Sequence, residues 1–145
     1  MLAGIKGRRS IPATELWVQK TSFKRNHLIL TDTGNTEIMV PYKELVAAYI
    51  EIPDKRTGHV IRPDISEVTE ELEGCLVLYD REYRRIRIHP RGGGEGAGAI
   101  LKQLAVHAPY LFWDYMPWLD EGDQEEFFRI REMVSVMRKV FSEKS

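Results

Sequence analysis

The feature that most constrains this chain is a glycine-dense hinge at residues 92–98, where five of the seven residues are glycine. Before the hinge, short apolar segments rich in β-branched and aromatic residues alternate with turn signals, which is typical of strands. After the hinge, apolar residues recur mainly at helical spacing. The sequence therefore predicts an α+β protein in which strands precede helices, with the hinge as a flexible loop between them.

The first part of the chain predicts seven short strands joined as hairpins. Asp32–Asn35 is a hairpin-turn signal, because glycine and asparagine tolerate a positive φ. Ile86 and Ile88 alternate with arginines, which is typical of a half-exposed antiparallel strand. The segment 64–74 leaves two structures open, a short amphipathic helix or an acidic loop. The expected strands are 15–18, 27–31, 36–40, 45–52, 59–62, 75–79 and 84–89.

The second part of the chain predicts a helix over 100–108, ended by Pro109, and a short aromatic strand over 110–115. A final helix begins near Asp123, which with Glu126 forms a capping-box pattern. Its apolar residues share one face, and we expect this face to cover the open end of the sheet. These residues are Phe127, Ile130, Val134, Met137 and Phe141.

A chain of 145 residues suits one domain, which we place at 14–145 behind a flexible N-terminal arm, 1–13. The net charge of -1 predicts no attraction to nucleic acid or to an anionic membrane. The longest apolar run, 45–50, is far too short for an integral membrane segment. Cys75 is the only cysteine, so no intramolecular disulfide can form and a reducing, cytoplasmic location is expected.

Hairpins followed by a C-terminal helix resemble the pleckstrin-homology (PH)-like barrel, over about 120 residues. The segment 100–115 followed by the charged helix 125–140 is similar to uncharacterised bacterial proteins of that fold. The resemblance implies a bent antiparallel sheet or PH-like barrel with a C-terminal amphipathic capping helix, and a binding module rather than an enzyme. The chain departs from phosphoinositide-binding members, because no dense Lys/Arg loop joins its first two strands.

Two motifs could bind an anion. The loop after the last strand could cradle a phosphate, and residues 91–96 resemble the pyrophosphate loop of acetyl-CoA-dependent N-acetyltransferases, which implies acetyl-CoA as a cofactor. An N-acetyltransferase needs helices between its early strands, whereas the first 60 residues predict hairpins, so a plain linker is favoured instead. Arginines surrounding His89 form the second motif, and the simpler interpretation is a solvated strand face paired with glutamates. The loop candidates are Gly92, Gly93, Gly94, Gly96 and Gly98, and the anion-binding candidates are Arg85, Arg87, His89 and Arg91.

Trp113 and Trp118 would form a partner or oligomer surface if both were exposed. The four histidines lack metal-ligand spacing, so neither a metal site nor a catalytic residue is expected. The leading hypothesis is a non-catalytic binding or interaction module of unknown ligand, with a protein partner or a homo-oligomer. The alternatives are an acyl-CoA-dependent N-acetyltransferase-like enzyme using the loop 91–98, and a homodimeric structural protein.

Overall fold

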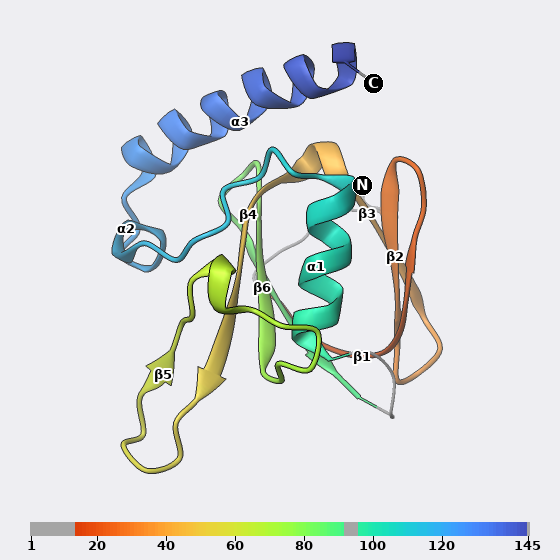
Figure 1. Cartoon of the computed structure of the whole chain (residues 1–145), viewed down its shortest axis with the longest axis vertical. Helices are drawn as coiled ribbons and strands as arrows, with labels where there is room; N and C mark the ends of the chain where they lie inside the picture. Colours follow the sequence, from red (N-terminus) through yellow and green to blue (C-terminus); the bar gives the residue numbers. More distant parts are fainter. Residues whose placement is uncertain (1–13, 92–95, 145) are drawn as a thin grey trace.

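The computed structural model describes residues 14–91 and 96–144. The expected N-terminal arm, 1–13, lies outside the described residues. The chain is α+β, as expected, with one mixed sheet and helices after it (Figure 1). The strands are β1 (Thr14–Phe23), β2 (His27–Asp32), β3 (Glu37–Pro41), β4 (Leu45–Pro53), β5 (Val60–Ile61), β6 (Cys75–Asp80) and β7 (Arg85–Pro90). The helices are α1 (Ala97–His107), α2 (Pro117–Asp120) and α3 (Gln124–Lys144), with short 3-10 turns η1 (Tyr42–Glu44) and η2 (Ile65–Glu67).

The seven strands lie in the order β3-β2-β1-β7-β6-β4-β5. The sheet is not wholly antiparallel, because β1 runs parallel to β7, with Thr14 opposite Ile86. The sheet is also not closed into a barrel, and β3 and β5 are its two edges. Hairpin signals in the sequence predict neighbours along the chain, whereas the β1–β7 pair joins two strands about 70 residues apart.

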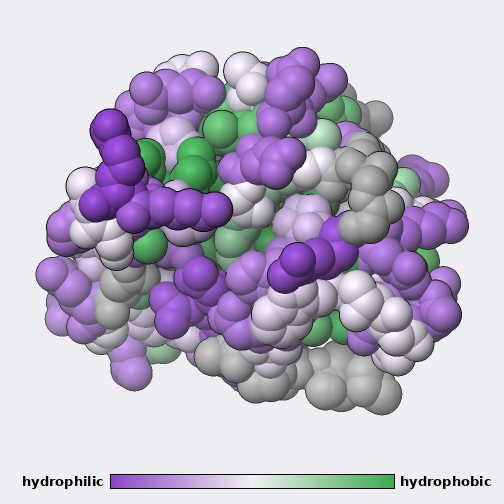
Figure 2. Space-filling model, turned by 90° about the horizontal axis from the view of Figure 1, so that it is seen from below, coloured by the Kyte–Doolittle hydropathy of each residue, from purple (hydrophilic) through white to green (hydrophobic). Residues whose placement is uncertain are grey.

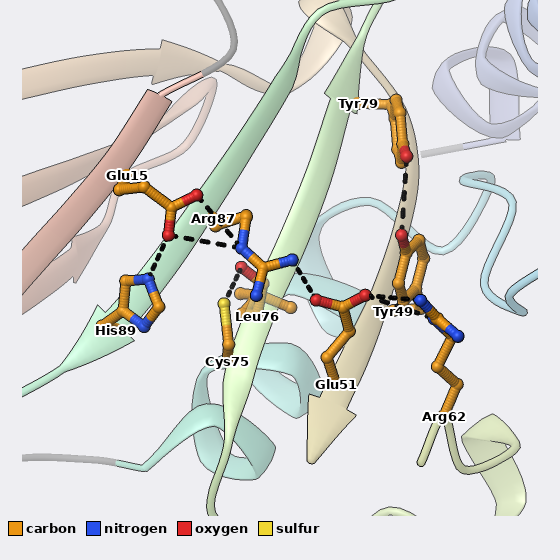
Figure 3. A network of polar contacts seen from close by, with 9 residues as sticks. All are labelled: Glu15, Tyr49, Glu51, Arg62, Cys75, Leu76, Tyr79, Arg87 and His89. Carbon is orange, nitrogen blue, oxygen red and sulfur yellow. Dashed lines mark hydrogen bonds and ion pairs between the residues drawn. The ribbon is translucent and has the colours of Figure 1, made fainter. Parts of the chain in front are cut away.

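The core lies on both sides of β6, whose six residues are all buried. Ile86 and Ile88 of β7 pair with Leu78 and Leu76 of β6, and residues paired across neighbouring strands point to the same face. This is the face that α1 covers. Part of the opposite face is covered by aromatic side chains, where Tyr79 lies 6.3 Å from Phe127 between ring centres. The rest of that face carries the polar side chains described below, with α1 behind the strands (Figure 3).

One local prediction is wrong, and one open alternative is resolved. The aromatic segment 110–115 is not a strand, because only Phe112 pairs, in a single bridge to Ala47. Pro109 and Pro117 bracket this segment and limit how far it can extend along β4. The segment 64–74 forms only the short turn η2 and further turns, so the expected choice between a helix and a loop is resolved in favour of irregular structure.

Helix α3 lies across one end of the sheet (Figure 1). Phe127, Ile130 and Val134 are buried, as the helical spacing predicts. Met137 and Phe141 are 54% and 39% exposed, so the expectation that the whole apolar face covers the sheet is corrected: its C-terminal half extends beyond the buried contact. None of the described helices is long and apolar enough to cross a membrane.

Candidate functional site

A pocket of about 300 Å³ lies where β4 and β7 end and β6 begins. Charged residues and apolar residues both contribute to its walls, and Figure 2 shows that this end of the molecule is mostly hydrophilic with hydrophobic residues between. A volume of this size is at the lower end of the range for small-molecule sites. The lining residues are Glu51, Pro53, Val60, Gly74, Cys75, Arg87, His89, Pro90 and Arg91.

Strand register brings the polar residues together on the face opposite α1. Glu15 of β1 pairs with Arg87 of β7, and Glu51 of β4 pairs with Cys75 of β6. Arg87 also pairs with Val77 of β6. Its side chain extends over β6 and lies between Glu15 and Glu51 (Figure 3). The parallel β1–β7 pair is therefore what places a carboxylate from residue 15 beside an arginine from residue 87.

Glu51 is a buried carboxylate, and its side chain is only 4% exposed. Arg62 donates to its Oε2 atom from Nη2 at 3.0 Å and from Nε at 3.2 Å. Arg87 donates from Nη1 to the other oxygen, Oε1. Arg62 also lies over the ring of Tyr115, with its guanidinium carbon 4.0 Å from the ring centre. A buried charge is tolerated only when it is paired, and two guanidinium groups provide that pairing here.

Glu15 links Arg87 to His89 at the more exposed side of the network. Its carboxylate lies 3.1 Å from Nε of Arg87 and 2.7 Å from Nε2 of His89. Burial by itself raises the pKa of Glu15, but the hydrogen bond with His89 and the charge of Arg87 outweigh it, so this pKa is lowered. His89 stacks on Trp17, with ring centres 4.8 Å apart and planes 17° apart.

The charges of this network balance, since two arginines face two glutamates. Arg91 is additional to that balance: it follows β7, lines the pocket and is exposed. Its backbone N–H donates to the carbonyl of Val18 at 2.8 Å, which ties the start of the loop to β1. With Arg91 counted, the pocket carries a net positive charge and suits an anion.

No family model, curated protein or solved structure matches this chain.

The structure brings three of the four predicted anion-binding residues into one pocket, namely Arg87, His89 and Arg91. Arg85 lies on the same face of β7, two residues before Arg87, but does not line the pocket. Arg87 and His89 are paired with glutamates, as the simpler interpretation of this strand face expects. Anion binding by the four residues stays a prediction.

Gly92, Gly93 and Gly94 lie outside the described residues, whereas Gly96 and Gly98 begin α1. The backbone N–H of Gly98 donates to the carbonyl of Leu72 at 2.9 Å. A side chain at Gly98 would place its Cβ only 2.0 Å from the carbonyl oxygen of Thr69. Close packing of α1 against the 68–72 turn therefore explains this glycine, and ligand binding by the loop stays a prediction.

Cys75 lines the pocket, but its thiol is poorly suited to act as a nucleophile. Burial raises the pKa of its thiol to about 11, so the thiol is protonated at neutral pH. The Sγ atom lies 3.7 Å from the carbonyl oxygen of Leu76. The described residues also contain no group of acidic, histidine and cysteine side chains able to hold a metal ion.

Trp113 and Trp118 are both half-buried. Trp113 donates from Nε1 to the carbonyl of Pro109 at 3.2 Å, and Trp118 packs on Phe112 with ring centres 5.5 Å apart. Both side chains therefore make internal contacts, and the partner surface that they would form together stays a prediction.

Sequence reasoning missed three members of the network, Glu15, Glu51 and Arg62. One signal could have found Glu51: it is an acidic residue near the end of the otherwise apolar segment 45–52, and a buried acid requires a cationic partner. Glu15 and Arg62 carry no such signal, because they lie far from β7 in the sequence.

Proposed function

We propose that this protein is a non-catalytic binding module whose pocket takes a small organic anion with an apolar part. The observation that carries the proposal is the pocket of about 300 Å³ in which Arg91 adds a positive charge to an already balanced set of ion pairs. Arg91 and His89 would face the anionic group, and Pro53, Val60 and Pro90 would contact the apolar part.

Two further observations support binding rather than catalysis. The buried, protonated thiol of Cys75 is a poor nucleophile. His89 uses its Nε2 atom in the contact with Glu15 and is stacked on Trp17, which holds the ring in a fixed orientation. The proposal includes the PH-like assignment: a hairpin-rich order and a C-terminal helix support it, whereas the open edges of the sheet depart from it.

The test is calorimetry and thermal-shift measurement with hexanoate, benzoate and phenyl phosphate, beside the neutral hexanamide and benzamide. We expect the anions to bind and to raise the melting temperature, and the neutral amides to do neither. Arg91→Gln should weaken anion binding about tenfold or more, because a hydrogen bond to a charged group contributes roughly 1.5–3 kcal/mol. Arg25→Gln removes the same charge from the exposed β1–β2 turn and should leave the affinity unchanged.

Three results would refute the proposal: no binding of any anion, equal binding of acids and amides, or equal effects of the two arginine variants. Stabilisation by acetyl-CoA alone would favour the acetyltransferase-like alternative instead.

A further inference from the structure

One flank of α3 carries a stripe of exposed apolar side chains. Met133, Val136, Met137 and Val140 follow i, i+3, i+4, i+7 spacing, and they are 52%, 61%, 54% and 40% exposed. The helix lies across one end of the sheet (Figure 1). Several neighbouring apolar side chains exposed on one helix mark an interaction surface.

The stripe lies next to the face that α3 already buries. Ile130 and Val134 are each 6% exposed and belong to the core. The helix is therefore apolar over a much wider sector than its contact with the sheet requires. A helix with this pattern is typical of elements that pack on two sides, as in helix bundles.

The charges along α3 indicate what packs on the second side. Residues 124–132 contain three acidic and two basic residues, whereas residues 133–142 contain two basic residues and no acidic one. Two copies of α3 aligned antiparallel would place the acidic half of one beside the basic half of the other. A parallel alignment would place like charges together, which is unfavourable.

We propose that the stripe binds a second copy of this chain, with the two α3 helices antiparallel about a two-fold axis beside Val136 and Met137. In this register Met133 of one copy faces Val140 of the other. Glu132 has a side chain that is 68% exposed and lies 3.5 Å from Arg131 within its own copy. Along the helix axis it lies two residues, or about 3 Å, from the level of Lys139 of the second copy, near enough for an ion pair, and symmetry makes this pair twice.

The dimer is weak by this geometry. A helix of 21 residues is about 31 Å long, and only four apolar side chains per copy occupy the stripe. Such a contact buries less than the roughly 1,200–2,000 Å² of a stable interface, so a Kd on the order of 100 μM is expected. The proposal is independent of the pocket, because no residue of α3 lines it.

The test is sedimentation equilibrium of the full chain from about 10 μM to about 1 mM, a range that spans the expected Kd. The average mass should rise from that of one chain toward that of two. Val136→Glu should weaken association at least about tenfold, because it places two like charges at the two-fold axis. Val106→Glu changes a valine that is 74% exposed on α1 and should leave association unchanged.

A charge exchange tests the register. Glu132→Lys and Lys139→Glu should each weaken the dimer several-fold, and the double variant should restore it. Circular dichroism melts of every variant separate lost association from lost folding. A chain that stays monomeric throughout, or a dimer that Val136→Glu does not weaken, would overturn the proposal. Failure of the double variant to restore association would overturn the antiparallel arrangement.

Discussion

Replacing Glu51 with glutamine tests the ion-pair network most directly. The substitution keeps the size of the side chain but removes a charge whose side chain is 4% exposed and which two arginines surround. Removing one partner from a fully buried ion pair costs roughly 3–5 kcal/mol. Here Arg62 and Arg87 are 25% and 27% exposed, so water recovers part of that loss and about 2 kcal/mol is expected.

For a chain of this length, 2 kcal/mol corresponds to a melting temperature lowered by about 6 °C. Differential scanning calorimetry of the wild type and Glu51→Gln measures this shift. Glu82→Gln is the matched control: it removes the same charge from a side chain that is 70% exposed and paired with Arg84. We expect the control to shift the melting temperature by less than about 1 °C, because exposed ion pairs contribute little.

Salt dependence adds a second criterion. A buried pair is screened only weakly, so the Glu51→Gln shift should persist in high salt, whereas any effect of Glu82→Gln should shrink. A Glu51→Gln melting temperature within about 1 °C of the wild type would refute the reasoning. It would mean that Glu51 is solvated, and that the pocket is not organised by buried charge.

Three further predictions concern the same face and the start of α1. Glu15 has a lowered pKa, so its ion pairs stabilise the protein above pH 4.5 and lose that effect as the pH falls through the lowered value. Glu15→Gln should therefore melt below the wild type at pH 7, by less than about 1 kcal/mol of stability, and the difference should shrink in melts at successively lower pH below 4.5. Cys75 should resist a thiol reagent at pH 8 in the folded protein and react at once in denaturant, since it is buried with a pKa of about 11; rapid labelling of the native chain, followed by absorbance, would contradict its burial. Gly98→Ala should lower stability by about 3 kcal/mol, because its new methyl group would contact the carbonyl oxygen of Thr69. The control Gly34→Ala should change stability little, because its methyl group meets only a carboxylate oxygen, at 3.4 Å. Equal denaturation midpoints for the two variants would show that the 68–72 turn shifts to accept the methyl group.

The anion-binding candidates show which features of the site can be predicted from the sequence. The alternation of Ile86 and Ile88 with arginines correctly places Arg87 and His89 on one half-exposed face of β7. The sequence does not predict that Glu15 and Glu51 contact these two side chains, because the two glutamates lie on strands that pair through long-range contacts. A two-residue periodicity defines which face a side chain occupies, and it contains no information about the neighbouring strand.

Helix α3 shows the same division. Its spacing correctly predicts a long amphipathic helix in which Phe127, Ile130 and Val134 are buried. The same spacing also assigns Met137 and Phe141 to the core, and the structure leaves both exposed. Periodicity predicts which face of the helix is apolar. How much of that face is buried depends on where the sheet ends.

By itself, the sequence determines the local elements of this protein: strands before the glycine hinge, helices after it, and the turn at Asp32–Asn35. These depend on interactions between residues close in the chain, which composition and spacing describe well. Tertiary structure alone decides the parallel pairing of β1 with β7, the burial of Glu51 between two arginines, and the exposed stripe of α3. Each of these features depends on which segments, far apart in the chain, pack against one another around the core. Local sequence patterns contain no information about those contacts.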